Sequence, residues 1–416
     1  MPTSVTVQRT GKAHLLQKRA ACYRLNASSA PCMSIDSHMS AGPYLKSIEL
    51  PAFPLLQPPS VTKSAAAPFS RRLRDLLADR FLDRRLEREP KLEADMVSAA
   101  RGLGRKAYPE HRTTDRQTAS WIDHAARDEL HRALLLIYQQ HMRLPQSESP
   151  DYQFHPLVCR LMHELEAPWE RDMIRRARAS YDLSLDALPE DPAAFSAWYR
   201  ATAFGHPLYE HDLYGFVACE AERHQLEWFF RMECAGEAAF DDLVALAQVG
   251  TRGEVKIEMA ANYWDEMGRG RSHAVHTHLF YKLIDGLHLE APPASELPWQ
   301  VLAGVNVMLW SSLPRRNAFR AQGCLGAVEL LAPQRCTRLV HGAQRVGIPK
   351  KTVVYYGAHA IIDIGHAERW LSHVIEPQVR SVPESRVGIA EGLIVRADAS
   401  LDYFDYCLAR ARTIAA

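Results

Sequence analysis

Three residues that can bind metal ions lie at regular intervals in the stretch YYGAHAIIDIGHAERW, residues 355–370. His359, Asp363 and His366 occupy positions i, i+4 and i+7. A helix turns by about 100° per residue, so all three lie along one stripe. Buried polar side chains need partners, and the stripe therefore indicates either a metal site or a buried His–Asp hydrogen-bond network. The isoleucines and tyrosines around it predict that the helix is largely buried.

A second group of candidate ligands lies in WDEMGRGRSHAVHTHLF, residues 264–280. On a straight helix Glu266 and His276 would be about 80° apart around the axis. They can share a metal only if the helix is kinked or unwound between them, and the glycines of GRG supply the backbone freedom that this needs. His273 and His278 are chemically equal alternatives to His276.

A third candidate is Glu233 in LEWFFRMECAGEAAFDDL, residues 226–243. It interrupts an aromatic and apolar helix, where a carboxylate is unfavourable unless it is paired or coordinated. Glu227 and Glu237 are alternatives in the same stretch. Carboxylates and imidazoles without cysteine suit iron or manganese better than zinc, although zinc stays open.

The elements that must position these residues are predicted to be helices. From Ser70 onward, leucines and phenylalanines recur at three- and four-residue steps, which is typical of a buried helical stripe. Strand-like alternation is scarce, so we predict an all-α fold in two helical parts. They are separated by a break near 185–195, where Asp191 is the expected N-cap. The expected helical stretches are 118–142, 156–180, 193–250, 254–290, 299–331 and 355–375, with a short segment after residue 400.

The composition is that of an ordinary globular protein, with 416 residues, 47% hydrophobic residues, 24% charged residues and a formal net charge of +1. This balance does not indicate nucleic acid or a membrane as a partner, and no apolar run reaches the roughly 18 residues of a spanning helix. The eight cysteines are scattered without a CxxC pair. We therefore expect free thiols and a cytoplasmic location.

The first 68 residues differ from the rest. Residues 1–35 contain no acidic residue but several basic ones, and residues 41–68 are rich in proline, serine and alanine. The segment lacks the hydrophobic region of a secretory signal. A disordered tail, or translation that starts at Met33 or Met39, accounts for it better than a transit peptide.

The pieces MECAG, YWDEMGRG followed by VHTHLF, and HAIIDIGH occur in an order that resembles the iron-containing redox enzymes with a haem-oxygenase-like fold, the haem-oxygenase-like dimetal oxidases. The resemblance covers about residues 195–395 and implies a haem-oxygenase-like helical bundle. That family has one Glu on the first core helix, a Glu with a His ten residues later on the second, and HxxxDxxH on the third. Two features depart from the pattern: Glu233 and Glu266 are further apart than in compact members, and His273 stands where some members have an extra carboxylate. The implied ligands are Glu233, Glu266, His276, His359, Asp363 and His366.

The resemblance implies two iron ions without haem, with manganese as an alternative metal, in an O2-activating oxidoreductase. The expected reaction is N-oxygenation of an amine-type small molecule in specialised biosynthesis. Oxidative C–C cleavage, decarboxylation or desaturation of an amino or fatty acid is the alternative, and an external reductant is expected. A ferritin-type di-iron site is disfavoured because no histidine has a Glu three residues before it. A non-catalytic metal- or partner-binding helical module stays open.

The predicted organisation is a tail over 1–68, an accessory helical region over 69–190 that could form a homodimer, and a dimetal oxidase domain over 191–416. Residues 315–351 carry eight Arg or Lys and one acid, Glu329. A solvated face is the ordinary interpretation of such a stretch. A site for a carboxylate-bearing substrate is the alternative, with Arg315, Arg316 and Arg320 as candidates.

Overall fold

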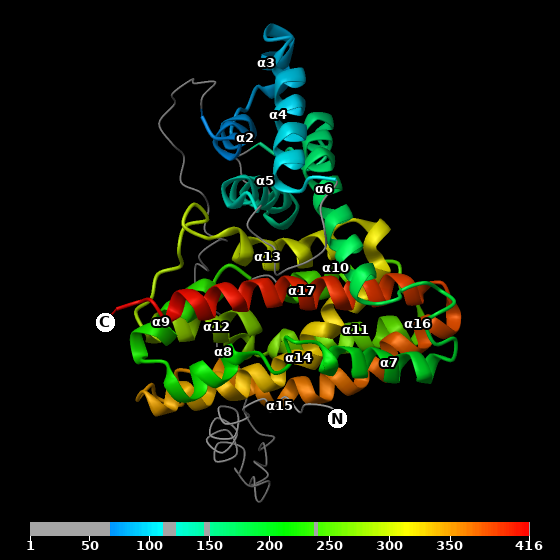
Figure 1. Ribbon diagram of the computed structural model, residues 1–416, viewed down its shortest axis with the longest axis vertical. Helices are drawn as coiled ribbons and strands as arrows, with labels where there is room; N and C mark the ends of the chain where they lie inside the picture. The colour runs from blue at the N-terminus through cyan, green and yellow to red at the C-terminus, as the bar shows by residue number, and fades with distance from the viewer. Residues whose placement is uncertain (1–66, 111–121, 145–149, 237–239, 416) are drawn as a thin grey trace, which may run out of the picture. The chain divides into compact units, whose positions relative to one another are not determined.

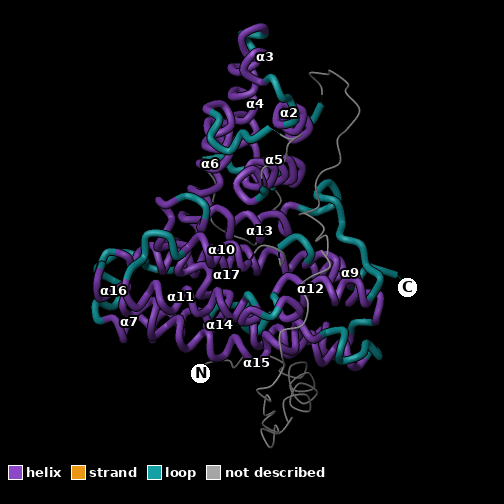
Figure 2. The backbone as a smooth tube through the Cα atoms, turned by 180° about the vertical axis from the view of Figure 1, so that it is seen from behind, coloured by secondary structure: helices purple, strands orange, loops and turns teal. Residues whose placement is uncertain are grey.

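The computed structural model describes residues 67–110, 122–144, 150–236 and 240–415. In this part of the chain there is no β-strand, and the all-α prediction is confirmed there (Figures 1 and 2). None of the described helices is both long and apolar enough to cross a membrane. The predicted tail, 1–68, lies outside the described residues except for its last two.

The longer helices carry most of the packing. Their bounds are α2 Phe69–Leu77, α3 Leu82–Arg88, α4 Leu92–Ala107, α5 His124–Met142, α6 Pro156–Ser180, α7 Pro192–Gly205, α9 Arg223–Glu233, α10 Phe240–Ala247, α11 Gly253–Glu266, α12 His276–Gly286, α13 Trp299–Ser312, α14 Ala318–Arg345, α15 Val354–Arg369 and α17 Ser385–Ala411. Shorter turns and helices connect them: α8 Asp212–Gly215, η2 Phe216–Glu220, η4 Gly268–Gly270, η5 Ser272–Ala274, η6 Arg315–Asn317, η7 Trp370–Ile375 and α16 Glu376–Ser381.

Helices α2, α4, α5 and α6 pack against one another (Figure 1). Their contacts are made by the apolar stripe expected from the sequence, which includes the fully buried Leu73, Leu130, Leu134 and Leu161. Apolar side chains at three- and four-residue steps face the same side of a helix, so they come together when such helices pack. The group also contacts the rest of the fold through α5 against α13 and α6 against α17.

The helices α14 and α17 pack closely along much of their length. Glycines allow this approach: a Cβ added to Gly323 would lie 1.9 Å from the backbone oxygen of Ile389, and one on Gly392 would lie 2.1 Å from that of Arg320. No other residue type fits at such distances. The residue pattern predicts only a short helical segment after residue 400, whereas α17 begins at Ser385 and has 27 residues. Gly388 and Gly392 lie inside this continuous helix, at points of contact with α14.

The predicted helix from Pro156 to Ser180 is confirmed, and so is the N-cap at Asp191, whose side chain accepts a hydrogen bond from the amide of Ala194 at 2.8 Å. The stretch from 193 to 290 is more broken than expected, since α7 to α12 are separate helices. The described residues all belong to one compact unit by their contacts. The division into 69–190 and 191–416 stays a prediction.

Candidate metal centre

A tight turn between α11 and α12 brings Glu266 and His276 together. Glu266 ends α11 and His276 begins α12. Between them Gly268, Arg269 and Gly270 adopt positive φ angles of 60°, 54° and 79°. A Cβ on Gly268 would lie 2.6 Å from the backbone of Ala274, so glycine is required there. The predicted break at GRG is confirmed, and it places His276 Nδ1 2.6 Å from Glu266 Oε2.

The inner face of α15 supplies the HxxxDxxH residues. Asp363 and His366 are buried and His359 is half-buried. His359 Nε2 lies 3.0 Å from His276 Nδ1, while His366 Nδ1 lies 3.7 Å from Asp363 Oδ1. The isoleucines of this helix point the other way: Ile361 is 74% exposed and Ile364 57%. The expectation that α15 is largely buried was therefore wrong, because its apolar residues occupy the face opposite the polar stripe.

Glu329 on α14 joins this group, although sequence reasoning did not select it. It is 2% exposed, and its Oε2 lies 3.4 Å from His366 Nδ1. Asn262 of α11 donates a hydrogen bond to the other oxygen, Oε1, at 2.8 Å. The signal that singled out Glu233, a lone acid in an apolar helical stretch, was equally present in GAVELLA around Glu329.

These residues form two overlapping groups that could each hold a metal ion. One comprises Glu266, His276 and His359, and the other comprises Glu266, Glu329 and His366. Within each group the potential ligand atoms lie within 4.8 Å of one another. Glu266 belongs to both, as expected of a carboxylate that bridges two ions. The donor set of oxygens and imidazole nitrogens suits iron or manganese.

Hydrogen bonds from outside the groups fix the orientation of each imidazole. His359 Nδ1 donates to the backbone oxygen of Tyr355 at 2.8 Å, which leaves Nε2 directed at the group. His366 Nε2 donates to Asp265 at 3.1 Å, which leaves Nδ1 directed inward. His276 Nε2 lies 3.1 Å from the Tyr355 hydroxyl. Metal-binding histidines typically have such partners on the nitrogen that does not bind the metal.

The electrostatics of the group also fit a cation. His366 Nδ1 is buried without a hydrogen bond, which is unusual for a buried nitrogen. Burial acts to lower the pKa of His366, but the carboxylates of Glu329, Asp265 and Glu266 raise it to about 9. Burial acts to raise the pKa of Glu266, but the neighbouring imidazoles lower it below its usual range. The carboxylates thus stabilise a positive charge at His366 Nδ1. A metal ion could bind this nitrogen in place of the proton.

Glu233 lies elsewhere and belongs to neither group. Its Oε1 forms an ion pair with Arg335 Nη1 at 2.5 Å, and its Oε2 accepts a hydrogen bond from Tyr356 at 2.7 Å. Both oxygens therefore face partners other than the imidazoles. The geometry favours Glu329 over Glu233 as the ligand that completes the set.

The remaining candidates have other neighbours. Asp265 binds His366 from outside the groups, and His278 contacts the backbone oxygen of Ser272. His273 is exposed, and Glu227 pairs with Arg223. Glu237 lies outside the described residues.

The three arginines predicted for a substrate do not line the pocket beside the metal groups. Arg316 pairs with Glu166 and Glu170, and Arg320 pairs with Glu391. Arg315 donates to the backbone oxygens of Val249 and Ser312. In this structure the three guanidinium groups contact other segments of the chain, and their role in substrate binding stays a prediction.

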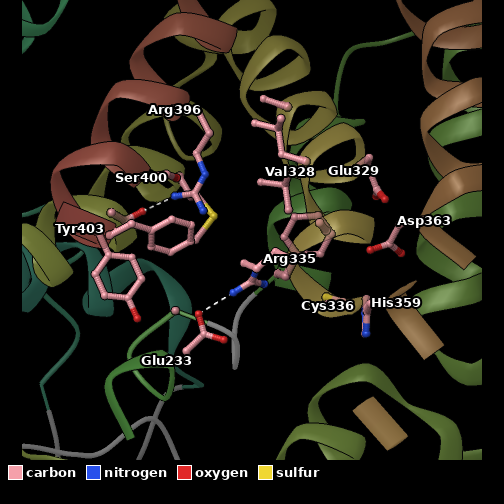
Figure 3. A pocket seen from close by; sticks show the side chains of 18 of the residues that line it. Glu233, Val328, Glu329, Arg335, Cys336, His359, Asp363, Arg396, Ser400 and Tyr403 are labelled. Carbon is pink, nitrogen blue, oxygen red and sulfur yellow. Dashed lines mark hydrogen bonds and ion pairs between the residues drawn. The ribbon is translucent and has the colours of Figure 1, made fainter. Parts of the chain in front are cut away.

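A pocket adjoins the metal groups (Figure 3). Glu329, Asp363 and His359 line one side, and Arg396, Ser400 and Tyr403 of α17 line the other. The Glu233–Arg335 pair lies between these sides in this view. The apolar part of the wall comes from α13, α14 and α17, with Val301, Val305, Met308, Val328, Leu331 and Phe404.

Comparison with known proteins agrees with the site. Residues 227–401 match the family described as iron-containing redox enzyme. A solved structure similar to this chain is that of a CADD-like protein of unknown function from Nostoc punctiforme, with 17% sequence identity and a TM-score of 0.43 over 52% of this chain and 95% of that one. A search of the curated proteins found no match.

The family match spans all the residues of both metal groups. It supports the predicted haem-oxygenase-like bundle for this part of the all-helical chain. Residues 227–401 are thus similar to the iron-containing redox enzymes, and the rest of the chain lies outside this match.

Proposed function

We propose that this protein is an O2-dependent oxidoreductase with a centre of two iron ions. Glu266 would bridge the ions, His276 and His359 would bind one, and Glu329 and His366 the other, with Asp363 adjacent to His366. The observation that carries the proposal is the pair of overlapping ligand groups that share Glu266 and have their imidazoles fixed from outside. Two ferrous ions held by such ligands supply the electrons for the reduction of O2.

The chain's own residues would bring a substrate to this centre. The pocket is lined by several of the metal-binding candidates: Glu266, His276, Glu329, His359 and Asp363. A molecule bound there would contact these residues directly. The apolar wall would exclude water from the reacting groups.

We propose N-oxygenation of an amine-type small molecule, in specialised biosynthesis, as the reaction. The buried Glu233–Arg335 ion pair in the pocket wall favours a polar, charged substrate over a hydrocarbon. Oxidative C–C cleavage or desaturation of an amino or fatty acid is the second candidate, which the long apolar wall of α13 and α14 favours. The external reductant, the homodimer and the cytoplasmic location stay predictions.

Anaerobic reconstitution with Fe(II), followed by rapid mixing with O2, tests the proposal. The wild type is expected to bind about two irons per chain and to consume O2, whereas His359→Ala is expected to bind less iron and to lose O2 consumption. Iron content well below one per chain, or unchanged in the variant, would contradict the two-iron centre. Iron binding without O2 consumption across amine and amino-acid substrates would favour the non-catalytic metal-binding module.

A further inference from the structure

The pocket wall contains a buried ion pair that the metal centre does not use. Glu233 and Arg335 come from α9 and α14, and their side chains are 2% and 15% exposed. The ion-pair distance is 2.5 Å, and the Tyr356 hydroxyl donates to the second oxygen of Glu233. Both charged residues line the pocket.

The same arrangement of three residues occurs away from the pocket. Glu166 of α6, with its side chain 4% exposed, pairs with Arg316 at 2.7 Å and accepts a hydrogen bond from Tyr138 at 2.7 Å. Neither Glu166 nor Arg316 lines this pocket. The two trios share their residue types but differ in surroundings: Arg316 is 48% exposed and also pairs with Glu170, and only the Glu233 trio lies at this pocket.

A buried ion pair discriminates strongly between ligands, because removing one partner leaves the other charge uncompensated. A ligand with only a carboxylate would separate Arg335 from Glu233 and leave the glutamate without its ion pair. A ligand with only an ammonium group would do the same to Arg335. A ligand that carries both groups can pair its ammonium group with Glu233 and its carboxylate with Arg335.

The position of the pair relative to the metal groups sets the orientation of such a ligand. Arg335 is six residues after Glu329 on α14, a rise of roughly 9 Å along the helix. On α15, Tyr356 contacts Glu233 while its neighbour Tyr355 contacts His276. If the charged end of a bound molecule lies at Glu233 and Arg335, the rest of the molecule therefore extends along the apolar wall toward the metal-binding residues.

We propose that the Glu233–Arg335 pair recognises the zwitterionic head of an amino-acid substrate. The α-ammonium group of the substrate binds Glu233, its carboxylate binds Arg335, and its side chain, which carries the nitrogen to be oxygenated, extends toward the metal centre. The inference rests on the proposed function for the identity of the pocket as the substrate pocket.

Calorimetric titration of the full-length chain tests this, with the chain metal-free and loaded anaerobically with Fe(II). One ligand series is L-phenylalanine, 3-phenylpropanoate and 2-phenylethylamine, and the other is 2-aminooctanoate, octanoate and heptylamine. Each series keeps one body and varies the head between zwitterion, anion and cation. In at least one series the zwitterion is expected to bind about tenfold or more tightly than either ion. Equal binding, tighter binding of an ion, or no binding in both series would overturn the proposal.

Variants assign the effect to the pair. Glu233→Gln combined with Arg335→Met removes both charges, so neither is left buried without its partner. The preference of the protein for the zwitterion is expected to disappear. The matched control, Glu166→Gln combined with Arg316→Met, is expected to keep it. A preference that survives the first double variant would overturn the proposal. If that variant does not fold, Arg335→Lys keeps the charge but loses the planar fork, and it is expected to weaken zwitterion binding by roughly tenfold.

The two proposals fail in different ways. Zwitterion preference without any O2 consumption would remove the proposed function and leave this recognition site in place. O2 consumption without zwitterion preference would leave the oxidoreductase and remove the recognition site.

Discussion

Glu329 and Glu233 are both buried carboxylates on helices that line the pocket, yet their neighbours give them different properties. Arg335 lies 2.5 Å from Glu233 and balances its charge. Glu329 instead faces His366 at 3.4 Å and accepts one hydrogen bond from the neutral amide of Asn262. A carboxylate without a fixed cation beside it binds a metal ion more strongly. The local charge balance thus favours Glu329 as the ligand.

Glutamine substitution separates these two roles. Glu329→Gln is expected to lower the iron content after anaerobic reconstitution to about half, because one of the two ions loses its carboxylate. Glu233→Gln, the matched control, is expected to keep the wild-type iron content. Metal analysis of both purified variants measures the difference. Loss of iron in Glu233→Gln with none in Glu329→Gln would restore the assignment made from sequence.

Helix α15 buries two tyrosines near its start and mainly polar residues after them. Its buried residues are Tyr355, Tyr356, Asp363, His366 and Ala367, whereas Ile361, Ile362 and Ile364 are 74%, 48% and 57% exposed. Burial of apolar area is the main stabilising contribution for most helices, and in α15 it is concentrated at Tyr355 and Tyr356 near the start of the helix. α17, by contrast, buries apolar side chains along most of its length. The order of α15 therefore depends on what its polar face binds.

Removal of metal is expected to loosen α15 and leave α17 unchanged. Without an ion, the carboxylates and imidazoles of the centre lack the ligand that would hold them together. Hydrogen exchange followed by mass spectrometry measures the protection of residues 354–369 with and without Fe(II), and α17 serves as the internal reference. Equal protection of α15 in both states would show that its packing alone orders the helix.

In the whole molecule, the N-terminal helices are joined to the rest of the described chain by polar contacts, one of them fully buried. His131 of α5 is fully buried. Its Nδ1 lies 3.2 Å from the Asn306 side-chain nitrogen of α13, and its Nε2 lies 2.7 Å from the Tyr108 hydroxyl. On α6, Arg178 pairs with Glu391 of α17. Burial, together with the nearby Arg127, lowers the pKa of His131 well below its usual value. Folding therefore requires this imidazole to remain neutral.

Acid is expected to weaken the protein through His131. Its pKa is lowered on folding, so the unfolded chain takes up the proton first. The stability is complete above the unfolded pKa of about 6.5 and falls as the pH drops below it, by up to about 1.4 kcal/mol per pH unit. Urea unfolding at several pH values measures this loss. His131→Gln is expected to show a shallower dependence, and an unchanged slope would exclude His131 as its source.

The sequence by itself determined the all-helical fold class, the polar stripe on α15 and the break between Glu266 and His276. These depend on local periodicity and on glycine's backbone freedom, which the order of residues specifies directly. Only the tertiary structure distinguishes the surroundings of Glu233 from those of Glu329. Both are lone acids in apolar helices, and a linear pattern does not show which one faces an arginine and which faces a histidine. That choice depends on the packing of α9, α14 and α15, which is set by contacts between residues far apart in the chain.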